Sequence, residues 1–135
     1  MRRKEIIFMR DYVILTDSGT DLSPAKAKEI DVRVLDLMVI MENEEPKANS
    51  AVDPKEFYQF MRDKHTATTS AINTDTFSEV MEQIINEGKD VIYIGFSSGL
   101  SNTYNAGRLA AEEMREKYPD SKIYAVDTLC ASLGQ

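Results

Sequence analysis

A hydroxyl-rich stretch from Phe96 to Tyr104 is the part of this chain best suited to hold a ligand. It reads Phe-Ser-Ser-Gly-Leu-Ser-Asn-Thr-Tyr, follows the apolar run 91–95 and precedes a helix-like segment. A small, glycine-containing turn between a buried strand and a helix N-terminus presents backbone N–H groups and the positive end of the helix dipole to one point. These features predict a binding site for an anion.

Three further polar groups could meet this turn. Segments 17–20 (Asp-Ser-Gly-Thr) and 127–128 (Asp-Thr) each follow an apolar run, and segment 66–70 (Thr-Ala-Thr-Thr-Ser) precedes a helix-like pattern. Ligands of open parallel sheets bind beyond the carboxyl ends of the strands, so we expect the groups that follow strands to share one edge. Segment 66–70 could fold over that edge. Each group taken alone is also typical of helix caps and turns.

The same residues give little support to catalysis. Asp17 and Asp127 could form an acid and base pair, but aspartates in such places more often hold loops by accepting backbone N–H groups. The only histidine, His65, lies in a charged stretch that we expect to be exposed, which disfavours a Ser-His-Asp triad. We expect Cys130 to be a packed thiol. Segment 98–102 lacks the second glycine and the lysine of a phosphate-binding P-loop.

Composition excludes several classes of partner. The 135-residue chain carries 23 acidic and 16 basic residues, a net charge of −7, which disfavours nucleic acid and anionic membrane surfaces. One cysteine cannot form an internal disulfide, and no Cys and His residues have metal-ligand spacing. We therefore expect a cytoplasmic domain with no metal.

The amino-terminal residues 1–11 are predicted to be a leader that could be disordered. They have a basic start but no long apolar region or small-residue cleavage site, and no run in the chain approaches the roughly 18 apolar residues of a membrane span. We expect one domain over residues 12–135.

The elements that must position the polar groups alternate along the chain. Apolar runs predict strands at 12–16, 32–41, 91–96 and 122–126, and apolar spacing with capping signals predicts helices from Pro24, at 53–63, at 74–88 and at 103–118. Residues 64–73 lack periodicity and are predicted to be a loop. This alternation favours an α/β fold with three layers, α/β/α, around a mainly parallel sheet of about four strands.

Read in order, the motifs resemble the amino-terminal part of the DegV family of bacterial fatty-acid-binding proteins. The residues that carry the resemblance are spread over nearly the whole chain from residue 12: Thr16-Asp17-Ser18 with Asp21-Leu22, Phe57-Tyr58 with Met61, Thr68-Thr69-Ser70, Ser97-Ser98-Gly99-Leu100-Ser101 with Thr103-Tyr104, and Asp127 with the segment Ala131 to Gln135.

The resemblance implies a protein of two domains that binds one long-chain fatty acid. Its acyl chain would lie in an apolar tunnel, and its carboxylate would bind hydroxyl groups and be presented to a separate fatty-acid kinase. Motif matching assigns the carboxylate to Thr69 and Ser98. Supporting positions at the same edge are Asp17, Ser18, Thr68, Ser70, Ser97, Ser101 and Asp127.

The chain departs from the family pattern in places that bear on binding. Ala71-Ile72-Asn73 stands where the family has Gln, Pro and a small polar residue, Asn102 replaces a Gly, and Thr128 replaces a Ser. The chain ends at Gln135, within a motif that in the family opens into a second domain. We therefore expect a domain truncated at its carboxyl end, whose exposed apolar surface could cause self-association.

Two rival functions stay open at this point. One is an enzyme of acyl or phosphoryl transfer built on the same crevice, with Asp17 or Asp127 as base. The other is a truncated fragment that binds nothing. The leading prediction is fatty-acid binding without catalysis and without any cofactor besides the bound lipid.

Overall fold

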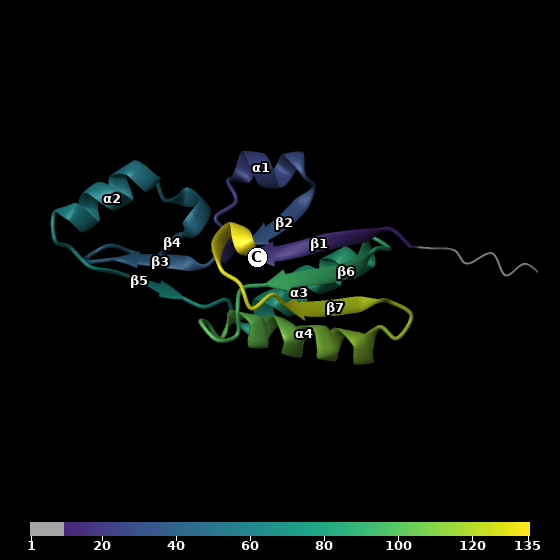
Figure 1. The fold of residues 1–135 in the computed structure, drawn as a ribbon. Helices are drawn as coiled ribbons and strands as arrows, with labels where there is room; N and C mark the ends of the chain where they lie inside the picture. The colour runs from purple at the N-terminus through teal and green to yellow at the C-terminus, as the bar shows by residue number, and fades with distance from the viewer. Residues whose placement is uncertain (1–9) are drawn as a thin grey trace, which may run out of the picture.

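The computed structural model describes residues 10–135, and a parallel sheet forms its centre (Figure 1). The strand order is β2-β1-β6-β7, with every neighbouring pair parallel. The helices and strands in chain order are β1 (Tyr12–Asp17), α1 (Pro24–Glu29), β2 (Val32–Leu35), β3 (Met38–Met41), β4 (Lys47–Ala48), α2 (Pro54–Arg62), β5 (Ala67–Ser70), α3 (Thr74–Asn86), β6 (Asp90–Gly95), α4 (Thr103–Lys117) and β7 (Ile123–Asp127).

Helices lie on both sides of this sheet. α3 and α4 pack together against one face, and α1 lies on the other side, next to β2 (Figure 1). Right-handed crossovers require this arrangement, because the chain moves in opposite directions along the sheet from β1 to β2 and from β6 to β7. The α/β fold with a parallel sheet of four strands is confirmed.

The main core lies between the sheet and the pair α3 and α4. Its fully buried side chains include Leu15, Phe77, Met81, Val91 and Tyr93. These residues come from alternate positions of β1 and β6 and from one face of α3. They follow the periods of two residues for a strand and 3.6 residues for a helix.

Local signals set the helix boundaries as predicted. The Ser23 hydroxyl accepts a hydrogen bond from the Lys26 amide, with Pro24 at the first helical position, and Asn73 caps α3 in the same way. After α3 the backbone turns at Gly88 with φ of +81°, a conformation that glycine adopts at little cost.

Two of our predictions about segments were wrong, and both errors concern a second sheet. Residues 32–41 form two strands: β2 joins the main sheet, while β3 pairs antiparallel with β4 and β5. Residues 64–73 are not all loop, because 67–70 form β5. We call residues 38–70 the small subdomain; it consists of this sheet with α2 and lies to one side of the main sheet (Figure 1). The threonines of β5 favour a strand even without alternation of apolar residues.

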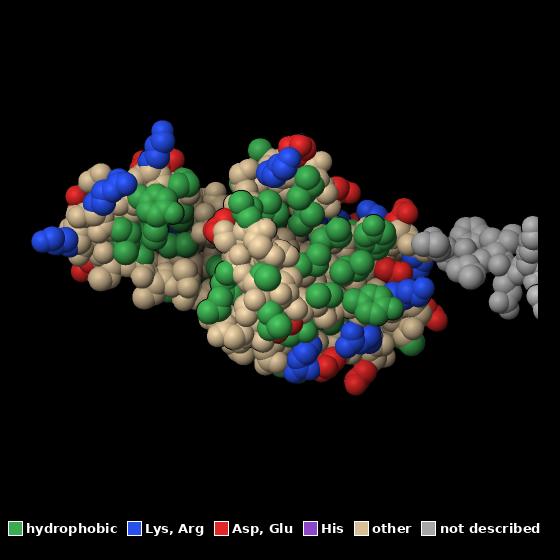
Figure 2. All heavy atoms as spheres, in the orientation of Figure 1, with side chains coloured by type: hydrophobic (Ala, Val, Ile, Leu, Met, Phe, Trp, Pro, Cys, Tyr) green, Lys and Arg blue, Asp and Glu red, His purple; other side chains and the backbone are tan. Residues whose placement is uncertain are grey.

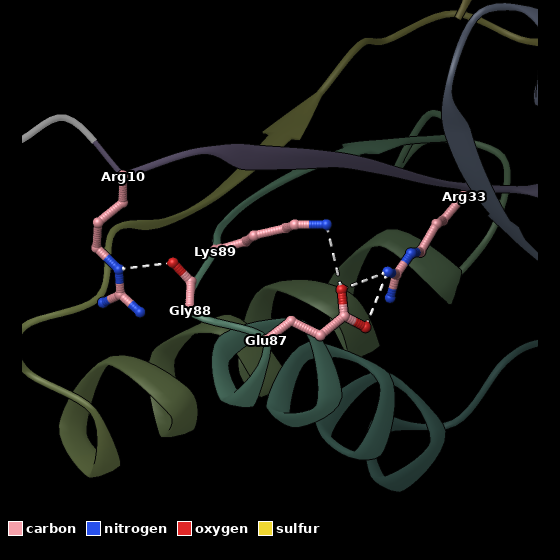
Figure 3. A network of polar contacts seen from close by, with 5 residues as sticks. All are labelled: Arg10, Arg33, Glu87, Gly88 and Lys89. Carbon is pink, nitrogen blue, oxygen red and sulfur yellow. Dashed lines mark hydrogen bonds and ion pairs between the residues drawn. The ribbon is translucent and has the colours of Figure 1, made fainter.

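A network of polar contacts ties the amino-terminal edge of the main sheet together (Figure 3). Arg10 Nε donates to the Gly88 carbonyl at 3.1 Å, and its Nη1 donates to Ser121 Oγ at 2.9 Å. Arg33 Nη2 lies 2.7 Å from Glu87 Oε2. Arg10 and residue 11 are therefore part of the folded domain, since the Asp11 carbonyl accepts from the Asp90 amide at 2.8 Å. The rest of the predicted leader, residues 1–9, lies outside the described residues.

The face of the main sheet opposite α3 and α4 remains largely open. Tyr12, Tyr124 and Val126 are exposed on it, and hydrophobic side chains gather over β1, β6 and β7 in Figure 2. Within residues 10–135, no helix has the length and apolar character needed to cross a membrane.

Candidate functional site

Three of the predicted polar groups lie at the carboxyl edge of the main sheet. β1 ends at Asp17, β6 ends at Gly95 just before turn 96–102, and β7 ends at Asp127. Because these three strands are parallel neighbours, their ends meet. The edge carries hydroxyl and carboxylate groups in close proximity.

Asp17 is fully buried and holds two turns rather than facing a ligand. Its Oδ1 accepts from the Gly19 amide at 3.0 Å, and its Oδ2 accepts from the Phe96 amide at 3.1 Å and the Tyr93 hydroxyl at 2.8 Å. Burial and the adjacent Asp17 carboxylate raise the pKa of Tyr93 far above its usual range, so this hydroxyl keeps its proton and donates. Asp17 therefore holds loops by accepting backbone N–H groups, as the sequence predicted.

Most hydroxyls of turn 96–102 stabilise the turn itself. Ser97 is buried and its Oγ accepts from the Gly99 amide at 3.2 Å. Ser101 Oγ accepts from the Thr103 amide at 3.2 Å, where it serves the first turn of α4. These two serines shape the turn and leave Ser98 as its exposed serine.

Ser98 and Asp127 are direct neighbours. The Ser98 amide donates to Asp127 Oδ1 at 3.2 Å, and the Leu129 amide donates to the same oxygen at 3.1 Å. A hydrogen bond from the Ser98 side chain, followed by these amides, lowers the pKa of Asp127 below its usual value. The Ser98 backbone N–H is thus already used, and its exposed hydroxyl also bonds to Asp127, so a ligand that accepts from this hydroxyl must compete with the Asp127 carboxylate.

An open cleft of about 1040 Å³ lies between α1 with β2 and the small subdomain. Its walls are mainly apolar, and two of the predicted residues, Ser18 and Thr69, line it. Ser18 also fixes the entry to the small subdomain, because its Oγ accepts from the Leu37 amide at 2.9 Å. The apolar lining comes from Leu22, Pro24, Ala27, Val32, Val34, Val39, Val52, Pro54 and Phe57.

Strand β5 separates Thr69 from its two neighbours. Thr69 pairs with Val39, and both line the cleft, whereas Thr68 and Ser70 pair with the exposed Ile40 and Met38. Cross-strand partners share a face of the sheet and successive residues alternate between faces. Thr69 therefore faces the cleft, and Thr68 and Ser70 belong to the opposite face of the small sheet.

The predicted site residues thus fall into two sets. Ser18 and Thr69 line the cleft, while Ser97, Ser98, Ser101 and Asp127 belong to the turns beyond β6 and β7, and Ser98 is not among the cleft residues. The sequence did not identify the apolar walls of the cleft, such as the buried Val39, or the buried Tyr93 that bonds to Asp17. The sequence held no signal for β3 as a separate strand, because residues 38–41 (Met-Val-Ile-Met) are all apolar and do not show the alternating exposure that the structure gives them.

Two residues considered for catalysis lie apart from the cleft. His65 is exposed, stacks on Phe60 with ring centroids 4.5 Å apart, and has its Nδ1 3.4 Å from Glu42 Oε2. The expectation of a packed Cys130 was wrong, because its side chain is exposed after β7. Within the described part of the chain, no group of three or more His, Cys, Asp and Glu residues could hold a metal ion.

Comparison with known proteins identifies relatives over almost the whole chain. The family model described as "Uncharacterised protein, DegV family" matches residues 11–135. A DegV domain-containing protein of Clostridium perfringens is 40% identical over 129 residues, which are 94% of this chain and 44% of the relative. The DegV domain-containing protein YteA of Lactococcus lactis is 35% identical and is covered to the same extent, 44%. The chain spans less than half the length of these curated relatives.

Solved structures share the fold. A stearic acid-binding protein from Eubacterium ventriosum superposes with a TM-score of 0.80 at 27% identity, covering 90% of this chain and 42% of that protein. A DegV family protein from Thermus thermophilus, described as binding fatty acid, gives a TM-score of 0.77 at 29% identity and covers 93% of this chain and 43% of that protein.

Proposed function

Because this chain belongs to the DegV family, we propose that it binds a fatty acid, with the acyl chain in the cleft beside the small subdomain. Two of its structural relatives are described as fatty-acid binders. The observation that carries the proposal to this chain is the apolar cleft itself, whose volume of about 1040 Å³ is at the upper end of small-molecule sites. An acyl chain bound there removes from water both its own apolar surface and that of the cleft walls.

The carboxylate is proposed to bind the hydroxyls of Thr69 and Ser98. Thr69 lies on the cleft face of β5, and Ser98 is exposed in turn 96–102. Hydroxyl donors can hold a carboxylate without a cationic partner, because hydrogen bonds to a charged acceptor are strong. Asp17, Ser97, Ser101 and Asp127 support the site by fixing the turns.

Native mass spectrometry of the protein purified from bacteria tests the proposal. We expect a bound mass equal to that of a fatty acid, released when the protein is unfolded. A bound nucleotide in its place would contradict the proposal and favour transfer chemistry. Binding without catalysis is the function proposed, and a fatty-acid kinase remains a predicted partner from the family resemblance.

A further inference from the structure

The ring of Tyr93 is closely packed among aromatic side chains and glycines. The side chain is fully buried between Phe77, with ring centroids 4.7 Å apart, and Tyr104, at 6.2 Å. A Cβ on Gly95 would lie 3.0 Å from the Tyr93 hydroxyl oxygen, and one on Gly107 would overlap the ring edge. Glycines at these positions let the ring enter, and the close packing then fixes it.

The hydroxyl of this fixed ring reaches a carboxylate that joins two parts of the site. Tyr93 donates to Asp17 Oδ2 at 2.8 Å, and the other donors to Asp17 are the amides of Gly19 and Phe96. No ion pair within residues 10–135 includes Asp17. A buried carboxylate without a cation depends on its hydrogen-bond donors, so these three bonds determine where Asp17 lies.

The two amides belong to the two turns that carry site residues. Gly19 is adjacent to Ser18, which lines the cleft, and Phe96 begins the turn that contains Ser98. The two turns are 79 residues apart in the sequence at Asp17 and Phe96. A shift of one turn relative to the other would move Ser98 relative to Ser18, whose hydroxyl holds the Leu37 amide at the entry to the small subdomain that carries Thr69. The distance between Ser98 and Thr69 would change with it, and polar sites tolerate only about 0.5 Å of such error.

We propose that the Asp17 and Tyr93 pair sets the relative position of the two turns and thereby the preference of the site for a carboxylate, Tyr93 being a positioning residue that does not touch the ligand. The proposal rests on the fatty-acid binding proposed above. Tyr93 differs from Thr69 and Ser98 in that it does not bond to the ligand, since it acts only through its hydrogen bond to Asp17.

The test compares hexadecanoate with hexadecan-1-ol as ligands of the 135-residue chain. Tyr93→Phe removes the hydroxyl and keeps the ring, and Tyr104→Phe is the matched control because its hydroxyl bonds to the Ala125 carbonyl at 3.4 Å, not to Asp17. We expect Tyr93→Phe to reduce the ratio of the two affinities about tenfold, in the range for weakening a charged hydrogen-bond network. Tyr104→Phe should leave the ratio as in the wild type.

The outcomes separate this inference from the proposed function. A lower unfolding midpoint with an unchanged affinity ratio in Tyr93→Phe would give Tyr93 a structural role alone and overturn the inference. A wild type that binds acid and alcohol equally would overturn the carboxylate site itself. Amide hydrogen exchange provides a check without any variant: Gly19 and Phe96 should be protected to the same degree, and protection factors that differ by more than about tenfold would show that the turns move independently.

Discussion

The hydroxyl groups of the candidate site differ in what they bond to. Ser97 and Ser101 accept amides of their own turn, and Ser18 accepts the Leu37 amide. Thr69 and Ser98 are exposed: Thr69 lies on the cleft wall, and Ser98 lies beside Asp127, to which its hydroxyl bonds. Mutation of a residue that stabilises a turn should lower the stability of the fold, whereas mutation of a residue that binds the ligand should lower the affinity.

Thr69→Ala and Ser98→Ala should each weaken fatty-acid binding by about 1–3 kcal/mol, the range for leaving a charged group short of one partner. Both side chains are exposed, so the unfolding free energy should change by no more than about 0.5 kcal/mol. Titration of a fluorescent fatty acid measures the affinity, and chemical denaturation measures the stability.

Two further variants sharpen this comparison. Thr76→Ala, an exposed threonine in the first turn of α3 and outside the cleft, should bind as the wild type does. Lys28 lines the cleft and offers a cation as a rival partner for the carboxylate. A loss of binding in Lys28→Gln, with Thr69→Ala unaffected, would contradict the assignment of the carboxylate to the hydroxyls.

For individual residues, the sequence predicted where polar side chains gather better than it predicted what each side chain bonds to. Hydroxyl-rich turns after strands pointed to the edge, and Asp17 was expected to hold loops. The packing of Tyr93 could not be predicted, because its ring neighbours Phe77 and Tyr104 and its bond to Asp17 come from other segments of the chain. The exposure of Cys130 depends in the same way on tertiary packing.

The close contact of α4 with the Tyr93 ring of β6 depends on a glycine inside the helix, Gly107. Replacing an exposed helical glycine with alanine usually stabilises a protein by about 1 kcal/mol. Here we expect Gly107→Ala to destabilise by about 1–3 kcal/mol, because the added Cβ would overlap the Tyr93 ring and force the helix or the ring to move. The midpoint and slope of denaturant unfolding measure the change.

A double-mutant cycle tells this clash from a general effect on α4. Tyr93→Leu leaves room at the ring edge, so adding Gly107→Ala to it should cost much less than adding it to the wild type. Equal costs in the two backgrounds would show that the ring is not the cause.

The elements of the main sheet were predictable because each has a strong local pattern. The strands at 12–16, 91–96 and 122–126 lie within one or two residues of their predicted bounds, and α1, α2 and α3 begin after residues whose side chains cap them. The small subdomain was not recognised. β3 and β5 have four residues each, and the divergence of β3 from β2 at residues 36–37 is set by contacts such as those of Asp36 with Ser50, Oδ2 to Oγ at 2.6 Å.

For the molecule as a whole, acid should destabilise the fold through its paired glutamates. The Arg33 hydrogen bond lowers the pKa of Glu87 from 4.5, and hydrogen bonds from Lys117 and Tyr118 lower that of Glu82. A carboxyl with a lower pKa when folded stabilises the fold fully above about pH 4.5, and this stabilisation is lost as the pH falls through the folded value. The unfolding free energy should therefore decline below about pH 4.5, and Glu87→Gln should make the decline shallower.

The open face of the main sheet leads to a prediction about self-association. Tyr12, Tyr124 and Val126 expose 60%, 56% and 46% of their surface on it. We expect the 135-residue chain to associate with itself at high concentration, and Tyr124→Lys to reduce this by placing a charge on the face. Sedimentation velocity over a range of concentrations would show a constant monomer mass if the prediction were wrong.

The central claim is that the cleft beside the small subdomain holds the acyl chain of a fatty acid. The most direct measurement uses stearate with a nitroxide near its methyl end, added to protein whose methyl groups are labelled for NMR. The account predicts selective broadening of the methyl signals of Val39 and Val52, which line the cleft, with Ile123 in the main core unaffected. Broadening of Val126, on the open sheet face, without Val39 and Val52 would contradict it.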